Sequence, residues 1–192
     1  DTVTLYPKME KYVKDLLISF GQDERILLWD LWNEPGNSNH GVSTLPHLKK
    51  VFEWAREVNP SQPLTCGVWN WNDSFAPLNA YQIEQSDVVS YHNYSDRADH
   101  EQTIKYFKMF NRPLVCTEYM ARRNNSLFST IMPLLKENKV VAINWGFVSG
   151  KTNTIFAWDE PKPNEKEPKL WFHDIYRQDK TPFDPAEVVL IK

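Results

Sequence analysis

Five short apolar runs, each followed by a segment with helical periodicity, limit what this chain can fold into. Apolar residues at three- and four-residue spacing predict helices over 7–20, 45–58, 76–85, 98–110 and 126–138. The apolar runs between them predict strands that start near residues 26, 64, 88, 114 and 140. Strands and helices that alternate in this way are typical of parallel βα units. The pattern therefore predicts an α/β fold.

The turns between these elements distinguish two kinds of α/β fold, the open doubly wound sheet and the (β/α)8 barrel. The chain has six glycines, and none of them forms the glycine-rich turn of a nucleotide-binding sheet. Polar and aromatic residues instead follow the ends of four or five separate strands, where barrel enzymes assemble their sites. This distribution favours part of a (β/α)8 TIM barrel, with about five βα units present.

The stretch Ile26–Pro35 predicts a buried strand with a carboxylate at its end. Its first residues are apolar, and Pro35 cannot donate a backbone hydrogen bond, so the strand ends beside Glu34. Asp30 has the same strand parity as Glu34, which predicts a buried acid beneath it. We interpret Asp30 as a structural hydrogen-bond partner in preference to a second catalytic group.

A second glutamate, Glu118, ends the predicted strand at Leu114–Thr117, three βα units after Glu34. In a closed barrel the two carboxylates would face each other across one opening. Glycoside hydrolysis uses such a pair, because one carboxyl group protonates the leaving oxygen while the other attacks the anomeric carbon or activates water. The alternative for each glutamate is a surface charge or an ion-pair partner.

Four motifs in this order resemble the C-terminal portion of a clan A glycoside hydrolase of the cellulase-like family 5 type. They are Trp32–Pro35, His92–Tyr94, Thr117–Tyr119 and Trp145. In the family these motifs follow the fourth, sixth, seventh and eighth strands of the barrel. The resemblance implies that residues 1–192 are a partial (β/α)8 catalytic domain holding the equivalents of strands 4 to 8.

The resemblance also implies a role for each motif. Glu34 would be the acid/base and Asn33 a contact to the sugar 2-hydroxyl, while Glu118 would be the nucleophile, hydrogen-bonded by Tyr94. Trp145 would lie under the sugar that is cleaved. The implied reaction is retaining hydrolysis of a β-linked polysaccharide or oligosaccharide by a cellulase-, mannanase- or xylanase-like enzyme, and the implied location is secreted or periplasmic.

Elementary chemistry assigns similar roles to these residues without the family. Glu34 must start protonated, which apolar neighbours such as Trp32 favour, and Glu118 must start ionised, which hydrogen bonds from Tyr94 or His92 favour. The strand parity of His92 predicts that it faces the interior of the barrel. The alternative for His92 is a core histidine without a functional role.

Several other polar and aromatic residues have two interpretations each. Trp69 and Trp71, after the 64–68 strand, would stack on sugar rings in an outer site or would simply pack. The segment 151–153 would contact substrate hydroxyls or would be a solvated loop. Arg122 and Arg123 are predicted to be a solvated pair.

The end of the chain and the missing strands give further expectations. A charged loop at 159–169 is predicted to precede a short helix at 170–176 and a tail. Because the first three barrel strands are not visible, the chain is predicted to be a fragment or to be completed by another chain. A sheet of five strands leaves two unpaired edges, through which association is expected.

Composition excludes several classes of partner. A net charge of −3 and no run of 18 apolar residues indicate neither a nucleic-acid nor a membrane partner. The expected partner is the carbohydrate substrate that the resemblance implies. No histidine, cysteine or acidic spacing predicts a metal site, and no cofactor is expected. Cys66 and Cys116 lie in separate apolar runs and are predicted to be buried free thiols. The alternative to an enzyme is a non-catalytic carbohydrate-binding or truncated, inactive barrel.

Overall fold

The computed structural model describes residues 2–160 and 166–192, which form two compact units. The first unit is Asp1–Tyr91 and the second is His92–Lys192. Part of the predicted charged loop, 161–165, lies outside the described residues. Each unit is described by itself.

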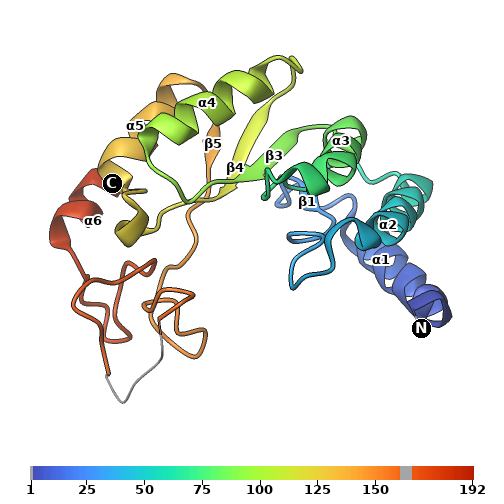
Figure 1. Cartoon of the computed structure of the whole chain (residues 1–192). Helices are drawn as coiled ribbons and strands as arrows, with labels where there is room; N and C mark the ends of the chain where they lie inside the picture. Colours follow the sequence, from blue (N-terminus) through green and yellow to red (C-terminus); the bar gives the residue numbers. More distant parts are fainter. Residues whose placement is uncertain (1, 161–165) are drawn as a thin grey trace. The chain divides into compact units, whose positions relative to one another are not determined.

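The first unit contains three helices beside a two-stranded parallel sheet (Figure 1). Its helices are α1 (Tyr6–Phe20), α2 (Leu45–Val58) and α3 (Ala76–Gln85), preceded or joined by the 3-10 turns Thr2–Leu5, Gly41–Thr44 and Asp73–Phe75. Its sheet pairs β1 (Trp29–Asp30) with β2 (Leu64–Thr65). The three helices lie where their periodicity predicted, within about one residue at each end.

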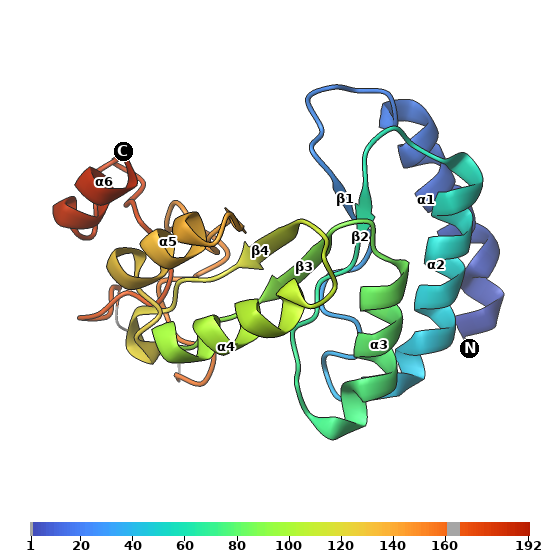
Figure 2. The same ribbon diagram turned by 90° about the horizontal axis from the view of Figure 1, so that it is seen from above.

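The core of the first unit lies between its helices and β2. Helices α1 and α2 pack side by side (Figure 2), and α2 contributes most of the buried side chains. The fully or nearly fully buried cluster comprises Leu17, Leu48, Phe52, Ala55, Leu64, Cys66, Phe75 and Leu78. Asn59 ends α2 in the left-handed conformation at φ 53°, which asparagine tolerates better than most residues.

The prediction of a buried strand over Ile26–Trp32 is wrong in extent and in burial. Strand β1 has two residues, Leu27 is 68% exposed, and Asp30 is exposed instead of buried. The backbone of this stretch pairs with β2 alone in the described sheet, so one strand edge has no sheet neighbour there. A run of apolar residues forms a strand buried on both faces only where other elements of the fold pack against both faces.

The second unit contains the parallel pair of β4 (Leu114–Glu118) and β5 (Val141–Ala142), in the register Val115 to Val141. Its helices are α4 (Arg97–Lys108), α5 (Phe128–Glu137) and α6 (Pro185–Ile191), and Arg122–Asn124 forms a 3-10 turn. Helices α4 and α5 lie next to each other (Figure 1). Strand β3 (Val89–His92) spans the junction of the two units in the sequence. The five described strands therefore start within three residues of the predicted positions.

The C-terminal segment differs from its prediction. Residues 170–176 form no helix, because their backbone groups bond to neighbouring loops: the Phe172 N–H donates to the carbonyl of Ile155, and the Tyr176 N–H to that of Phe147. The predicted tail contains α6 instead. Asp184 caps this helix through its side chain, and Pro185 follows in the first turn, a start signal that the sequence carried.

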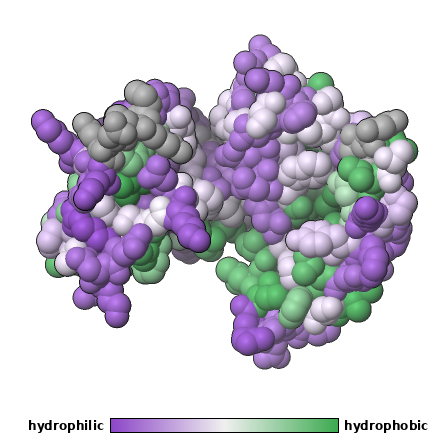
Figure 3. Space-filling view, turned by 90° about the horizontal axis from the view of Figure 1, so that it is seen from below, coloured by the Kyte–Doolittle hydropathy of each residue, from purple (hydrophilic) through white to green (hydrophobic). Residues whose placement is uncertain are grey.

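Cys66 and Cys116 are buried free thiols, as predicted. None of the helices in the described residues has the length and apolar character needed to cross a membrane. Figure 3 shows apolar side chains gathered in patches among polar ones on the face seen from below, and exposed large apolar side chains occur in both units.

Candidate functional site

Glu118 is the centre of the polar cluster in the second unit. It is the last residue of β4 and is only 9% exposed. The hydroxyl of Tyr94 donates a hydrogen bond of 2.5 Å to its Oε2 atom, and Nδ1 of His92 lies 3.2 Å from the same oxygen. The structure therefore brings together three residues that the sequence predicted as partners. The hydroxyl of Tyr94 and the ring of His92 thus meet at one oxygen of a buried carboxylate and orient it.

Asn93 fixes the backbone that carries His92 and Tyr94. Its N–H donates to the carbonyl of Glu118 at 3.0 Å, and its side-chain amide donates to Asp99 and Thr103. Its own carbonyl accepts from Nε2 of His100 at 3.0 Å. Burial lowers the pKa of His100 to about 4. His100 is therefore neutral near pH 7, and because a carbonyl only accepts, its proton is on Nε2.

Trp145 lies after β5, and its backbone is bonded to the loop that directly follows Glu118. Its N–H donates to the carbonyl of Tyr119 at 3.0 Å, and its side chain is 41% exposed. Gly146 follows at φ +87°, and a Cβ there would lie 2.7 Å from Cβ of His173 and 3.0 Å from Oδ1 of Asp174. Only glycine fits this turn, so the position of Trp145 depends on close packing against the C-terminal segment.

In the first unit, Glu34 lies in a turn directly after the β1 stretch. It adopts φ +47°, an unfavourable conformation for a residue other than glycine, and is half-buried. The side-chain amide of Asn37 donates to its Oε2 atom at 2.6 Å. Asn33 beside it is exposed, whereas the carbonyl of Trp32 accepts a hydrogen bond from the Cys66 thiol at 3.2 Å. The Glu34 carboxylate is therefore held by its own loop.

The two tryptophans after β2 have different environments. Trp69 donates from Nε1 to the carbonyl of Pro35 at 2.9 Å and packs edge-on against Phe75 with ring centroids 5.5 Å apart. These contacts favour the packing interpretation for Trp69, and they support the turn that contains Glu34. Trp71 is 46% exposed. Stacking on sugars stays a prediction for both.

A model of the family Cellulase (glycosyl hydrolase family 5) matches residues 4–151, more than three quarters of the chain. The chain belongs to glycosyl hydrolase family 5. The resemblance of its four motifs to this family is thereby confirmed, whereas the role of each residue stays a prediction. No curated protein matches the sequence.

Solved structures establish the fold of this family 5 chain. A Bacteroides uniformis β-glucuronidase 2 superposes with a TM-score of 0.66 at 13% identity, over 92% of this chain and 24% of its own. The structure of XacCel5A in complex with cellopentaose gives 0.59 at 12%, over 96% and 64%. That of CbXyn10B gives 0.65 at 12%, over 97% and 68%.

These likenesses confirm the predicted fold class, part of a (β/α)8 barrel. The chain spans about a quarter of the β-glucuronidase and less than two thirds of XacCel5A.

Arg122 and Arg123 were predicted to be a solvated pair, and for Arg122 this is wrong. Its guanidinium is buried and forms a bidentate ion pair with Glu187 of α6. It also donates to the carbonyls of Trp171 and Asp174. Arg123 is partly exposed and pairs with Asp159. Two adjacent arginines look alike in a sequence, and the spacing to Glu187 is too long to indicate the pair.

Sequence reasoning also missed the residues around the Tyr94 ring. Trp158 packs edge-on at 4.9 Å between ring centroids, and His173 lies tilted at 5.2 Å. No local pattern could have indicated them, because Trp158 and His173 lie more than 60 residues after Tyr94 in the sequence. The segment 151–153 is partly exposed, and none of its side chains contacts Glu118 through a described hydrogen bond.

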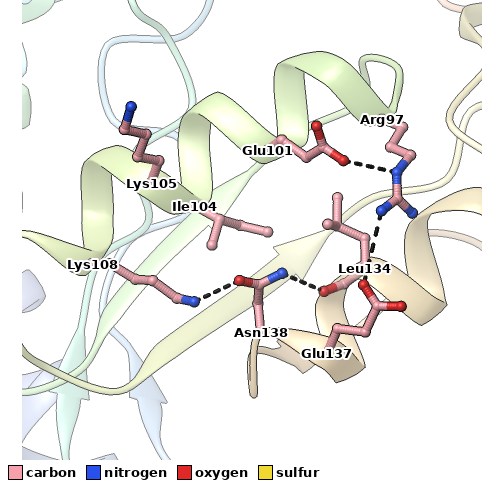
Figure 4. A pocket seen from close by; sticks show the side chains of 8 residues that line it. All are labelled: Arg97, Glu101, Ile104, Lys105, Lys108, Leu134, Glu137 and Asn138. Carbon is pink, nitrogen blue, oxygen red and sulfur yellow. Dashed lines mark hydrogen bonds and ion pairs between the residues drawn. The ribbon is translucent and has the colours of Figure 1, made fainter.

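A separate hollow lies on the outside of the second unit, between α4 and α5 (Figure 4). It has a volume of about 510 Å³ and is lined by Arg97, Glu101, Ile104, Lys105, Lys108, Leu134, Glu137 and Asn138. Glu101 accepts from Arg97, and Lys108 donates to Asn138. None of the predicted site residues lines this hollow, so substitutions there should leave the predicted site unchanged.

Proposed function

We propose that this protein is a retaining β-glycoside hydrolase that cleaves O-glycosidic bonds in a β-linked polysaccharide or oligosaccharide. The observation that carries the proposal is the buried Glu118 at the end of β4, contacted at one oxygen by Tyr94 and His92. Membership of family 5 supports the same reaction class. We further propose that residues 1–192 form part of one catalytic domain.

Glu118 would be the nucleophile. Its carboxylate attacks the anomeric carbon, the bond to the leaving oxygen breaks, and a covalent glycosyl-enzyme ester forms. The hydrogen bond from Tyr94 keeps the carboxylate ionised and oriented before the attack. His92 would hold the same oxygen from a second direction.

Glu34 would be the acid/base. It donates its proton to the leaving oxygen in the first step and then removes a proton from the water that hydrolyses the ester. The hydrogen bond from Asn37 and the constrained turn at φ +47° would limit the directions in which the carboxyl group can point. Retention requires the two carboxyl groups to lie about 5 Å apart when substrate is bound.

Aromatic residues would supply the sugar contacts. The exposed face of Trp145 would stack under the sugar that is cleaved, with Asn33 bonding its 2-hydroxyl. Trp32, Trp69 and Trp71 would contact further sugars. The neighbour XacCel5A was solved with cellopentaose, so cello-configured substrates belong in a first panel together with manno- and xylo-configured ones.

Azide rescue of two variants tests both roles. With an aryl β-glycoside that needs no acid, azide should replace the missing nucleophile of Glu118→Gly and give an α-glycosyl azide. In Glu34→Ala, azide should attack the glycosyl-enzyme and give the β-glycosyl azide. The anomers are assigned by proton NMR.

A matched control is Glu101→Gln, which removes an exposed carboxylate of α4 that lines the hollow between α4 and α5 and not the predicted site. It should hydrolyse the substrates like the unmodified protein. Loss of hydrolysis without azide products in either glutamate variant would contradict the roles. Binding of oligosaccharide without any product in the unmodified protein would favour the non-catalytic alternative.

A further inference from the structure

We propose that His173 is a positioning residue for Glu118, which it holds in place through the strained backbone of Met120 and through the ring of Tyr94. The inference rests on the proposed role of Glu118 as the nucleophile. His173 lies 55 residues after Glu118 in the sequence but contacts the loop that directly follows it.

Met120 is the strained point of this loop. It adopts φ +77°, a left-handed conformation that a long side chain disfavours, and it is fully buried. It stands two residues after Glu118, so its backbone sets how the chain leaves β4. A strained residue keeps its conformation only where the surroundings prevent relaxation.

His173 restrains the peptide between Met120 and Ala121 from its carbonyl side, while the N–H of the same peptide, that of Ala121, donates to the carbonyl of Ser126 at 3.0 Å. The Nδ1 atom of His173 lies 2.6 Å from the carbonyl oxygen of Met120, and because a carbonyl only accepts, Nδ1 carries the proton. On the other side, the N–H of Met120 donates to the hydroxyl of Ser126 at 3.3 Å, a longer and weaker contact.

The imidazole ring also packs on the residue that bonds Glu118. Its centroid lies 5.2 Å from that of Tyr94, and Trp158 packs against both rings. A shift of His173 would therefore disturb the nucleophile in two ways, through the backbone after Glu118 and through the Tyr94 hydroxyl.

The surroundings hold His173 itself firmly. It is fully buried, its N–H donates to the carbonyl of Thr154, and its Cβ lies against Gly146. Burial, aided by the charge of Arg122, lowers its pKa to about 4. The ring is therefore neutral in an assay near pH 7, and it positions the loop without adding a charge beside Glu118.

Two variants separate the hydrogen bond from the packing. In His173→Asn the amide nitrogen takes the place of Nδ1 and can still donate to Met120, whereas His173→Phe keeps a ring beside Tyr94 and loses the donor. The probes are 2-deoxy-2-fluoro glycosides with a good leaving group in gluco, manno and xylo configuration. The readouts are the rate constant of covalent labelling at saturation and the half-saturation concentration.

We expect H173F to label about 10- to 100-fold more slowly, with half-saturation changed less than about threefold, since small misplacements of a reacting group have effects of this size. H173N should stay within about threefold of the unmodified protein. Phe107→Leu, a buried change on α4, controls for lost stability and should label normally. If H173F does not fold, H173Q replaces it, because its amide lies one bond too far out.

The outcomes distinguish this inference from the proposed function. If the unmodified protein is not labelled at Glu118, the proposed function fails. If it is labelled there and H173F is labelled at the same rate, the positioning role is refuted. Equal slowing in H173N and H173F, in proportion to lost stability, would also overturn it in favour of a merely structural histidine.

Discussion

The ion pair between Arg122 and Glu187 should contribute strongly to the free energy of unfolding. The side chain of Arg122 is buried at 3% exposed, that of Glu187 is partly buried at 15%, and their two hydrogen bonds are 2.9 and 2.6 Å long. Arg122 also donates to two backbone carbonyls and lies over the ring of Phe183, 4.7 Å from its centroid. Arg122→Met therefore leaves a partly buried carboxylate and two carbonyls without their donor.

The magnitude follows from these lost partners. Breaking a buried pair by removing one partner costs about 3–5 kcal/mol, so we expect about 4 kcal/mol for R122M. Glu187→Gln keeps a neutral acceptor and should cost about 2 kcal/mol, in the range for a hydrogen bond to a charged group. In the double variant the second change should cost little, because its partner is already gone.

Urea denaturation of the four proteins, followed by tryptophan fluorescence, measures these free energies. Trp171 is a suitable reporter in the affected region, because its ring stacks on Phe183 at 5.2 Å. Arg123→Met is the matched control: it removes the adjacent, partly exposed arginine and should cost less than about 1 kcal/mol. If R122M costs no more than R123M, the reasoning about the buried pair is refuted.

Three further predictions concern the packing around Glu118. Because the pKa of His100 and of His173 is lowered to about 4 from 6.5, only the unfolded chain binds these protons at intermediate pH. The free energy of unfolding should therefore fall between pH 6.5 and 4, by about 3 kcal/mol for each histidine. Urea titrations at several pH values should show a smaller fall for H173N. Equal slopes of unfolding free energy against pH in H173N and the unmodified protein would contradict this. Gly146→Ala should lower the free energy of unfolding by about 3 kcal/mol, because φ is +87° and the new Cβ would meet His173. A thermal midpoint unchanged within about 1 °C would argue against this close approach. Asn93→Ala should slow hydrolysis by about tenfold with little change in KM, because it frees the backbone beside Glu118; an unchanged kcat would show that this network does not orient the site.

The helices were predictable because their signals are local. Apolar spacing and end signals such as Gly21 and Asn59 act within a few residues, and α1 and α2 end where these residues stand. The burial of the β1 stretch was not predictable, because it depends on which chain segments cover its two sides. Leu27 shows this most clearly, being apolar but exposed.

The site was predictable where strand ends carry it and unpredictable where loops support it. The contact of Glu118 with Tyr94 and His92 followed from motifs at the ends of β3 and β4. The supporting contacts of Arg122 and His173 join segments about 50 to 65 residues apart, and only the folding of the C-terminal segment brings them together. No local pattern marks such contacts in a single sequence.

The position of the covalent label in the unmodified protein tests the central claim most directly. After reaction with a 2-deoxy-2-fluoro glycoside of the preferred configuration, the protein is digested with pepsin and the labelled peptide is sequenced by mass spectrometry. The account predicts one added sugar, attached to the carboxylate of Glu118. A label on any other residue, or an unlabelled protein that still hydrolyses the parent substrate, would contradict it.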